Sequence, residues 1–296
     1  MVPHGVYSDF TIAALPSPIE RCDRLYTRTW NALPAMCTLI AIHRTVSGAP
    51  LVVAANRDEY LDRPSEGPSI QETPSGPMMA PRDVRAGGTW LGVNPTGVFA
   101  GVTNRRGNSE DPSRRTRGTL VSEALAAATA REGARIITRV PEDAYNAFNF
   151  FIADANDAFV ITYDARPELR ELAPGPHLVG NVEPDDRREP KVDRLMERAE
   201  KVAKCGRENV LDELSSVCRE HDSGGGPLAD TCVHTPLYGT RSSCLYLQGS
   251  TRSEDHFFFA EGSPCTQPYQ DLTALLPELS RRAGHGTREQ QSRRVI

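Results

Sequence analysis

The chain has 296 residues, of which 39% are hydrophobic and 25% are charged, a composition typical of a folded globular protein. Its formal net charge of −5 argues against a general nucleic-acid-binding protein, because such proteins carry basic faces that neutralise phosphates. No apolar run approaches the roughly 18 residues that a membrane-spanning helix needs. The length fits one large domain or two small ones.

The cysteines argue against both a disulfide framework and a metal module. Seven of them are scattered along the chain without a C-x-x-C pair, which is typical of reduced thiols in a cytoplasmic protein. A zinc site would need Cys205, Cys218, Cys232, His221 and His234 to converge, and their spacing does not resemble a zinc module. We therefore expect no bound metal and a cytoplasmic location.

The two ends of the chain differ in composition from the part between them. Residues 1–36 mix acidic and basic residues with several prolines, and they lack the features of a secretory signal or a mitochondrial presequence. We expect either a disordered extension or a start codon assigned too early, with a processed propeptide as the alternative. The polar tail at 279–296 is also expected to be disordered. This leaves 37–278 as a single domain.

The first elements of that domain are predicted to be hairpins. Residues 39–44 and 51–56 are β-rich runs on either side of a segment with turn chemistry. Residues 62–86 are rich in proline, glycine and serine, and we expect them to form a loop. A second hairpin is predicted at 87–104, where its glycines suggest bulges or a close approach between backbones.

The second half of the domain alternates between helical and strand-forming segments. Residues 105–118 form a polar loop with five arginines, which is either solvated or an entrance for an anionic substrate. The other predicted elements are helices at 118–132, 189–205 and 209–218, and strands at 149–154, 158–164, 169–172, 177–181, 243–248 and 256–261. Strands in hairpins with helical blocks after them predict an α+β fold of antiparallel sheets covered by helices.

Several polar side chains are expected at the ends of these strands. Cys37 opens the first strand, Asp58 follows the second, and Asn181 and Arg241 stand beside two later strands. Each alone is an ordinary core, turn or surface residue, and only the set together indicates chemistry. If Met36 were the first residue, its removal would give Cys37 a free α-amino group, so that one residue would carry both a nucleophile and a base.

Five segments together resemble the NRDE family, also called transport and Golgi organisation 2. They are 36–38 (MCT), 55–59 (ANRDE), 87–92 (GGTWLG), 103–105 (TNR) and 238–243 (YGTRSS). The resemblance runs from Met36 to about Glu261. It implies the fold of the N-terminal nucleophile hydrolases, a four-layer αββα sandwich in which two antiparallel sheets face each other between outer helices. The nearest functional comparison is with the choloylglycine hydrolase and penicillin V acylase group.

This resemblance assigns catalytic roles to residues of the chain. Cys37 would attack an amide carbonyl with its own α-amino group as the base, and Asp58 would orient that amine. Asn181, with Asn104 or backbone N–H groups, would hold the developing oxyanion. Arg241 would favour the thiolate through its positive charge.

The chain departs from the acylase pattern in ways that concern activation and substrate. Thirty-six residues precede Cys37, and Thr103 and Asn104 stand where the acylases have a single asparagine. Arg57 replaces an uncharged residue, which suggests an anionic substrate. Together with Thr103, Asn56 and Arg105, it is a candidate substrate-binding residue.

The function implied is a cysteine amidohydrolase that cleaves a non-peptide C–N bond of a small molecule and requires no cofactor. The alternative is a non-catalytic binding or trafficking protein of the family, with a role in haem handling or Golgi organisation. A haem carrier would need exposed axial ligands, for which His43, His177, Met78 and Met79 are the candidates. The expected partner is therefore a small amide or haem, and the sequence does not predict an oligomeric state.

Overall fold

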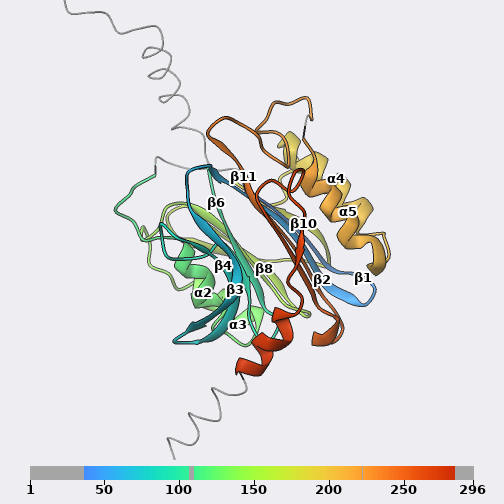
Figure 1. Cartoon of the computed structure of the whole chain (residues 1–296). Coiled ribbons are helices and arrows are strands. Elements are labelled where there is room, and N and C mark those ends of the chain that lie inside the picture. The colour runs from blue at the N-terminus through green and yellow to red at the C-terminus, as the bar shows by residue number, and fades with distance from the viewer. Residues whose placement is uncertain (1–36, 107–109, 222, 284–296) are drawn as a thin grey trace, which may run out of the picture. The chain divides into compact units, whose positions relative to one another are not determined.

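The computed structural model describes residues 37–106, 110–221 and 223–283, which form two antiparallel β-sheets with helices outside them (Figure 1). The six-stranded sheet has the order β10-β1-β2-β11-β12-β13, and the seven-stranded sheet runs in sequence order from β3 to β9. The first sheet therefore brings together strands from the beginning, middle and end of the domain.

The strands of the six-stranded sheet are β1 (Thr38–Val46), β2 (Ala49–Tyr60), β10 (Gly175–Val179), β11 (Tyr238–Gln248), β12 (His256–Glu261) and β13 (Gln270–Asp271). Those of the seven-stranded sheet are β3 (Ser65–Thr73), β4 (Gly76–Asp83), β5 (Leu91–Val93), β6 (Phe99–Asn104), β7 (Phe148–Ala153), β8 (Ala158–Tyr163) and β9 (Pro167–Glu171). The helices outside the sheets are α2 (Gly118–Ala124), α3 (Ala130–Ile137), α4 (Pro190–Val202) and α5 (Arg207–Arg219). A short 3-10 turn at Arg252–Glu254 and a helical segment at 275–283 complete the described helical elements.

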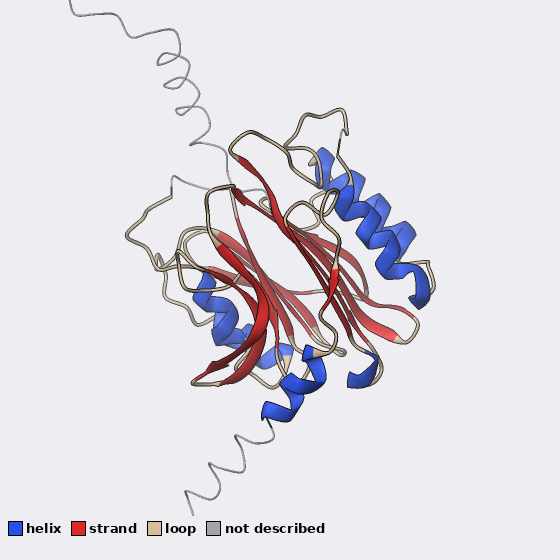
Figure 2. Ribbon diagram, viewed as in Figure 1, coloured by secondary structure: helices blue, strands red, loops and turns tan. Residues whose placement is uncertain are grey.

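Three hydrophobic clusters divide the domain into four layers. Because neighbouring side chains of a strand point to opposite faces, Leu39 of β1 packs into the cluster between the sheets, while Ile40 packs into the cluster under α4 and α5. The third cluster joins the outer face of the seven-stranded sheet to α2 and α3. Figure 1 and Figure 2 show α2 and α3 outside one sheet and α4 and α5 outside the other. The predicted four-layer αββα architecture is confirmed.

Two glycines allow backbone and side chains to approach closely. A Cβ on Gly101 of β6 would lie 2.9 Å from Leu39 Cδ1, so the glycine makes room for a core side chain of the opposite sheet. A Cβ on Gly88 would lie only 2.6 Å from the carbonyl carbon of Gly118, where α2 begins. The close backbone approach predicted for the second hairpin is thus present at Gly88 and Gly101.

The predicted loop at 62–86 is wrong, because most of it forms β3 and β4. Turn-forming residues occupy the ends of this hairpin, and its register shifts between Glu66 and Ser69, where Pro68 stands. β3 is the edge strand of its sheet, and an edge strand tolerates a proline because its N–H groups are not all needed for pairing.

The predicted helix at 118–132 is interrupted, and α2 and α3 take its place. The side chain of Asn94 donates hydrogen bonds to the carbonyls of Leu125 (3.1 Å) and Ala127 (2.7 Å), which would otherwise continue the helix. Thr129 then caps α3 by accepting a hydrogen bond from the backbone N–H of Glu132. A long-range contact therefore ended a helix that local spacing predicted to continue.

The domain extends beyond the predicted boundary at residue 278. Residues 275–283 are helical, and Leu276 and Leu279 are buried in the cluster between the sheets. Disorder was therefore the wrong expectation for 279–283, while 284–296 and 1–36 lie outside the described residues. Across the described ranges, no helix is long and apolar enough to span a membrane.

Candidate functional site

Cys37 lies at the point where three strands of the six-stranded sheet meet. The register places Thr38 opposite Asn56 of β2 and Leu39 opposite Val179 of β10. Cys37 therefore stands between the end of β10 and the N-R-D-E segment of β2. Its Sγ is 3.8 Å from the main-chain oxygen of Asp58, within the range of a weak S–H donor. The predicted neighbourhood of Cys37 and Asp58 is thus present in the fold.

The thiol of Cys37 is held in its protonated form in this chain. Burial and the negative charge of Asp58 raise its pKa to about 12, and the positive charge of Arg57 opposes this shift only in part. Because the thiolate is the nucleophile, a thiol with such a pKa is nearly unreactive at neutral pH. Cys37 therefore needs a further group to remove its proton.

Asp58 is buried, and only one of its two carboxylate oxygens has a hydrogen-bond partner among the described residues. Its Oδ1 accepts a hydrogen bond from Thr240 Oγ1 at 2.6 Å, whereas its Oδ2 has no hydrogen-bond partner among the described residues. Burial raises the pKa of this carboxyl to about 7, against the lowering effect of the charge on Lys191. A buried acceptor without a partner is costly, so this oxygen is well suited to receive an ammonium group.

Lys191 was not predicted from the sequence, where a lysine at a helix start looks like a solvated residue. It lies in the first turn of α4, and its Nζ is buried without a hydrogen-bond partner among the described residues. Burial lowers the pKa of this amine, while the charge of Asp58 raises it. A buried lysine and a buried carboxyl near one thiol are characteristic of functional sites.

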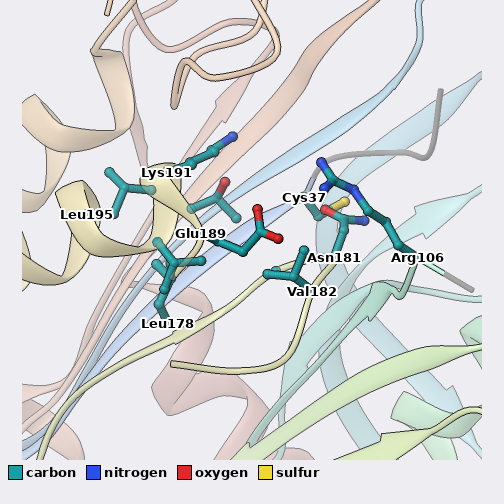
Figure 3. Close-up of a pocket in the computed structure, with 11 residues that line it drawn as sticks. Cys37, Arg106, Leu178, Asn181, Val182, Glu189, Lys191 and Leu195 are labelled. Atoms are coloured by element: carbon teal, nitrogen blue, oxygen red, sulfur yellow. The ribbon is translucent and has the colours of Figure 1, made fainter. Parts of the chain in front are cut away.

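A small cavity of about 40 Å³ opens beside Cys37, with room for roughly two or three water molecules. Figure 3 places Lys191 and Glu189 on one side of it and Cys37, Asn181 and Arg106 on the other. The remaining wall is mainly apolar and is formed by Leu178, Val182, Val192 and Leu195 together with Thr38 and Gly180. Glu189 and Arg106, like Lys191, carried no signal in the sequence beyond their charge.

Asn181 and Asn104 are in contact, but the contact uses the main chain of Asn104 and not its side-chain amide. Asn181 Nδ2 donates to the carbonyl oxygen of Asn104 at 2.6 Å, and Asn181 lines the cavity with Cys37. Thr103 Oγ1 donates to the carbonyl of Gly180, also at 2.6 Å. These bonds join the end of β6 in one sheet to the end of β10 in the other. The contacts of Thr103 are therefore with the protein itself.

Asn56 and Arg57 are also bound within the protein. Asn56 Nδ2 donates to two main-chain carbonyls, those of Cys218 and Thr231, each at 2.9 Å. Arg57 donates to Asp83 Oδ2 at 3.2 Å, and its guanidinium carbon lies 4.4 Å from the ring centroid of Trp90. The G-G-T-W segment thus supports the N-R-D-E segment. Asn56 Oδ1 and Arg57 Nη1 are buried without a hydrogen-bond partner among the described residues, and the substrate-binding role of the two residues stays a prediction.

Arg105 lies in a different depression from the one that contains Cys37. Its guanidinium pairs with Asp164 at 3.1 Å and with Glu183 at 2.9 Å. The next residue, Arg106, lines the cavity of Cys37 instead. The two consecutive arginines after β6 thus line different depressions, a difference that the sequence does not show.

Arg241 occupies a β-bulge of β11 beside the N-R-D-E segment. Thr240 pairs with Asp58 and Ser242 pairs with Arg57, so Arg241 is the extra residue between them. Bulges of this kind redirect a side chain and are frequent near active sites. Its Nε is buried without a hydrogen-bond partner among the described residues. Arg241 was predicted to favour the thiolate of Cys37. The positive charge that lowers the pKa of Cys37 is that of Arg57, and it acts against the raising effects of burial and Asp58.

The four candidate haem ligands are all buried or occupied. His43 is buried, with its Nε2 3.1 Å from a main-chain carbonyl oxygen. His177 Nδ1 lies 3.0 Å from Asp185 Oδ2. Met78 and Met79 are both buried. None of the four is therefore an exposed side chain available to coordinate a haem iron.

Two solved structures show a distant likeness to the chain. One is a Caenorhabditis elegans orthologue of N-acylethanolamine-hydrolyzing acid amidase, at 14% identity and a TM-score of 0.47, covering 71% of this chain and 92% of that one. The other is a mutant of the conjugated bile acid hydrolase from Clostridium perfringens, at 10% identity and a TM-score of 0.48, covering 81% and 93%. We base no inference about this chain on likenesses of that size.

Several proteins are more similar to the chain in sequence. The bovine and human Transport and Golgi organization protein 2 homologues are each 29% identical to the chain, over 72% of it and 86% of their own length. The mouse homologue is 34% identical over 143 residues, which is 45% of this chain and half the length of the mouse protein. The family model described as Transport and Golgi organisation 2 matches residues 36–261. The chain belongs to the Transport and Golgi organisation 2 family.

Proposed function

We propose that the chain, in a form that begins at Cys37, is a cysteine amidohydrolase that cleaves the C–N bond of a small non-peptide amide. The observation that carries this proposal is the placement of Cys37 beside a buried carboxyl whose Oδ2 has no partner among the described residues. A free α-ammonium group on Cys37 would supply the donor that this oxygen lacks. It would also place a base on the same residue as the thiol.

The first half of the reaction forms a thioester. The neutral α-amino group of Cys37, whose ordinary pKa is about 8, removes the thiol proton as the sulfur attacks the amide carbonyl carbon. Asn181 donates to the carbonyl oxygen as it becomes an oxyanion. The C–N bond then breaks, and the α-ammonium group returns the proton to the leaving amine. Asp58 holds the α-amino group in place throughout.

The second half releases the acid. A water molecule attacks the thioester carbonyl carbon while the α-amino group accepts one of its protons. The C–S bond breaks, the sulfur leaves with its electron pair, and the proton returns to it from the α-ammonium group. The products are a carboxylic acid, an amine and the regenerated Cys37. No cofactor takes part in any of these steps.

The cavity favours a short apolar acyl group. Its volume of about 40 Å³ and its wall of Leu178, Val182, Val192 and Leu195 fit a few methylene groups at most. An anionic substrate, as suggested by Arg57, is not part of the proposal, because Arg57 is bound to Asp83 and Trp90. We expect activity to fall as the acyl chain lengthens beyond what this cavity accepts.

The test compares two forms of the protein. One is the full chain, and the other starts at Met36, so that removal of this methionine leaves Cys37 as the first residue, which intact mass verifies. Both are incubated with acyl p-nitroanilides of increasing chain length, and nitroaniline release and the acyl adduct on Cys37 are followed. We expect turnover and a thioester only in the second form, and neither in its Cys37→Ala variant.

Two outcomes would overturn the proposal. One is a form beginning at Cys37 that is folded but forms no acyl adduct with any member of the series. The other is a Cys37→Ala variant with the same turnover as its parent. Either would move the assignment to the alternative, a non-catalytic binding or trafficking protein of the family. Intact mass of the protein from its own cells would show whether the form beginning at Cys37 exists there.

A further inference from the structure

A second cluster of reactive side chains lies outside the cavity of Cys37. Cys232 Sγ is 3.5 Å from Cys265 Sγ and 3.5 Å from His234 Nε2, and His234 Nε2 is 3.1 Å from Cys265 Sγ. The three ligand atoms therefore form a compact triangle. Neither the mechanism proposed above nor the family resemblance uses any of these residues.

The triangle is assembled from two segments that are distant in sequence. Cys232 and His234 are separated by one residue and precede β11, while Cys265 follows β12. Cys232 is buried, Cys265 is half-buried and His234 is exposed. One side of the cluster is thus set in the protein and the other faces solvent, so an ion can reach it.

The distances match those required by a tetrahedral zinc ion. With Zn–S bonds of about 2.3 Å and a Zn–N bond of about 2.0 to 2.1 Å, two sulfurs on one zinc lie about 3.8 Å apart and a sulfur and a nitrogen about 3.5 Å apart. The observed separations differ from these values by a few tenths of an ångström. A disulfide would need the two sulfurs at about 2.05 Å, far closer than they are.

We propose that Cys232, His234 and Cys265 bind a Zn²⁺ ion. Two thiolates and one imidazole are a ligand set that suits zinc among the common divalent metals. A zinc ion takes a fourth ligand, and the ring of His221 lies next to that of His234, with 5.6 Å between their centroids. His221 or a water molecule completes the tetrahedron.

The proposed ion would hold the segment that supports Asp58. The N–H of Val233, between two of the ligands, donates to Thr240 Oγ1 at 2.8 Å, and the same hydroxyl donates to Asp58 Oδ1 at 2.6 Å. On the other side, the carbonyl of Thr231 accepts from Asn56. The zinc would therefore be structural, and it would fix this segment against β2 whether or not Cys37 is catalytic.

The test is a metal-binding measurement on the full chain, purified under reducing conditions. After removal of bound metal, the protein is titrated with Zn²⁺ in competition with a chromophoric chelator, and with Co²⁺ for the visible bands of tetrahedral thiolate coordination. We expect one ion per chain. Removing a residue that only hydrogen-bonds to a metal ligand typically weakens metal binding by about tenfold or more. Cys265→Ser and His234→Ala each remove a ligand itself, so each should weaken zinc binding by at least about tenfold.

Matched variants separate ligand loss from general damage. Cys205→Ser removes another half-buried cysteine and His256→Ala another histidine, and both should bind zinc like the parent. Circular dichroism of the two ligand variants shows whether they remain folded. The proposal is overturned if the reduced chain binds no zinc, if the ligand variants bind it as tightly as the controls, or if peptide mapping shows Cys232 and Cys265 joined in a disulfide in the purified protein.

Discussion

The chemistry of Cys37 depends on the groups around it and, under the proposed mechanism, on whether its α-amino group is free. Its surroundings include a carboxyl, an amide and a cavity, yet burial and Asp58 raise the pKa of its thiol to about 12. The same surroundings would act in the opposite sense on a free α-amino group, because Asp58 stabilises a nearby positive charge. Under the proposed mechanism, the residue would be inert in the full chain and reactive in a form that begins at Cys37.

Alkylation should reveal this difference directly. In the full chain, we expect iodoacetamide to modify Cys37 more slowly than Cys205 at neutral pH, although both are half-buried, because the raised pKa of Cys37 leaves an exceptionally small fraction of thiolate. In the form that begins at Cys37, the order should reverse. The measurement is the rate of labelling of each cysteine by mass spectrometry. Faster labelling of Cys37 than of Cys205 in the full chain would contradict the raised pKa.

Arg57 has contacts within the protein that give it a structural role. It binds Asp83 and stacks on Trp90, and its side chain is buried. We expect Arg57→Met to lower the free energy of unfolding by about 2 to 4 kcal/mol, because it leaves Asp83 with less compensation for its burial. Arg82→Met, on the exposed side of β4, should change it by less than about 0.5 kcal/mol. Urea unfolding compares them, and equal losses would contradict the assigned role.

At the scale of elements, local patterns and long-range contacts made different contributions. The first hairpin was predictable because β1 and β2 contain apolar runs on either side of a turn, and its register, with Thr38 opposite Asn56, brings Cys37 close to the N-R-D-E segment. The hairpin of β3 and β4 was not, since its prolines and glycines resemble those of a loop. Lys191 and Arg106 were missed for a related reason, because only the packing of α4 and of the two sheets turns them toward Cys37.

The close approach of Gly88 to the start of α2 gives an element-scale prediction. A Cβ at Gly88 would lie 2.6 Å from backbone atoms of Gly118, which cannot rotate away as a side chain could. We expect Gly88→Ala to lower the free energy of unfolding by about 1 to 3 kcal/mol. Gly67→Ala is the control, because its Cβ would have 3.9 Å to the nearest atom. A Gly88→Ala variant as stable as the control would show that α2 moves freely.

At the scale of the whole domain, the site lies where both sheets and the helical layer over one of them are joined. Asp58 on β2 and Asn181 after β10 both belong to the six-stranded sheet, Lys191 lies on α4, and Arg106 follows β6 of the seven-stranded sheet. The strand order β10-β1-β2 brings Asp58 and Asn181 together although they are more than a hundred residues apart in the chain. The overall architecture follows from hairpins and helical blocks, but the identity of the groups that meet at this corner depends on the packing of all four layers.

The stability of the domain should depend on pH through Asp58. Its pKa is about 7 in the folded full chain, against an ordinary value of 3.8, because burial disfavours the charge. Between these two values the folded state keeps a proton that the unfolded state has released, so the free energy of unfolding falls as the pH rises from about 4 to about 7. The contribution amounts to about 4 kcal/mol at most.

Comparison with Asp58→Asn isolates this contribution from the other titrating groups. In the full chain, the stability of the parent relative to this variant should decrease from pH 4 to pH 7 and then remain constant. In the form that begins at Cys37, the α-ammonium group beside Asp58 should lower the pKa of the carboxyl, so most of the decrease should disappear. Urea unfolding of the four proteins across this range measures both effects. Identical profiles for the two parents would mean that the α-amino group does not reach Asp58, and the proposed catalytic arrangement would lose its base.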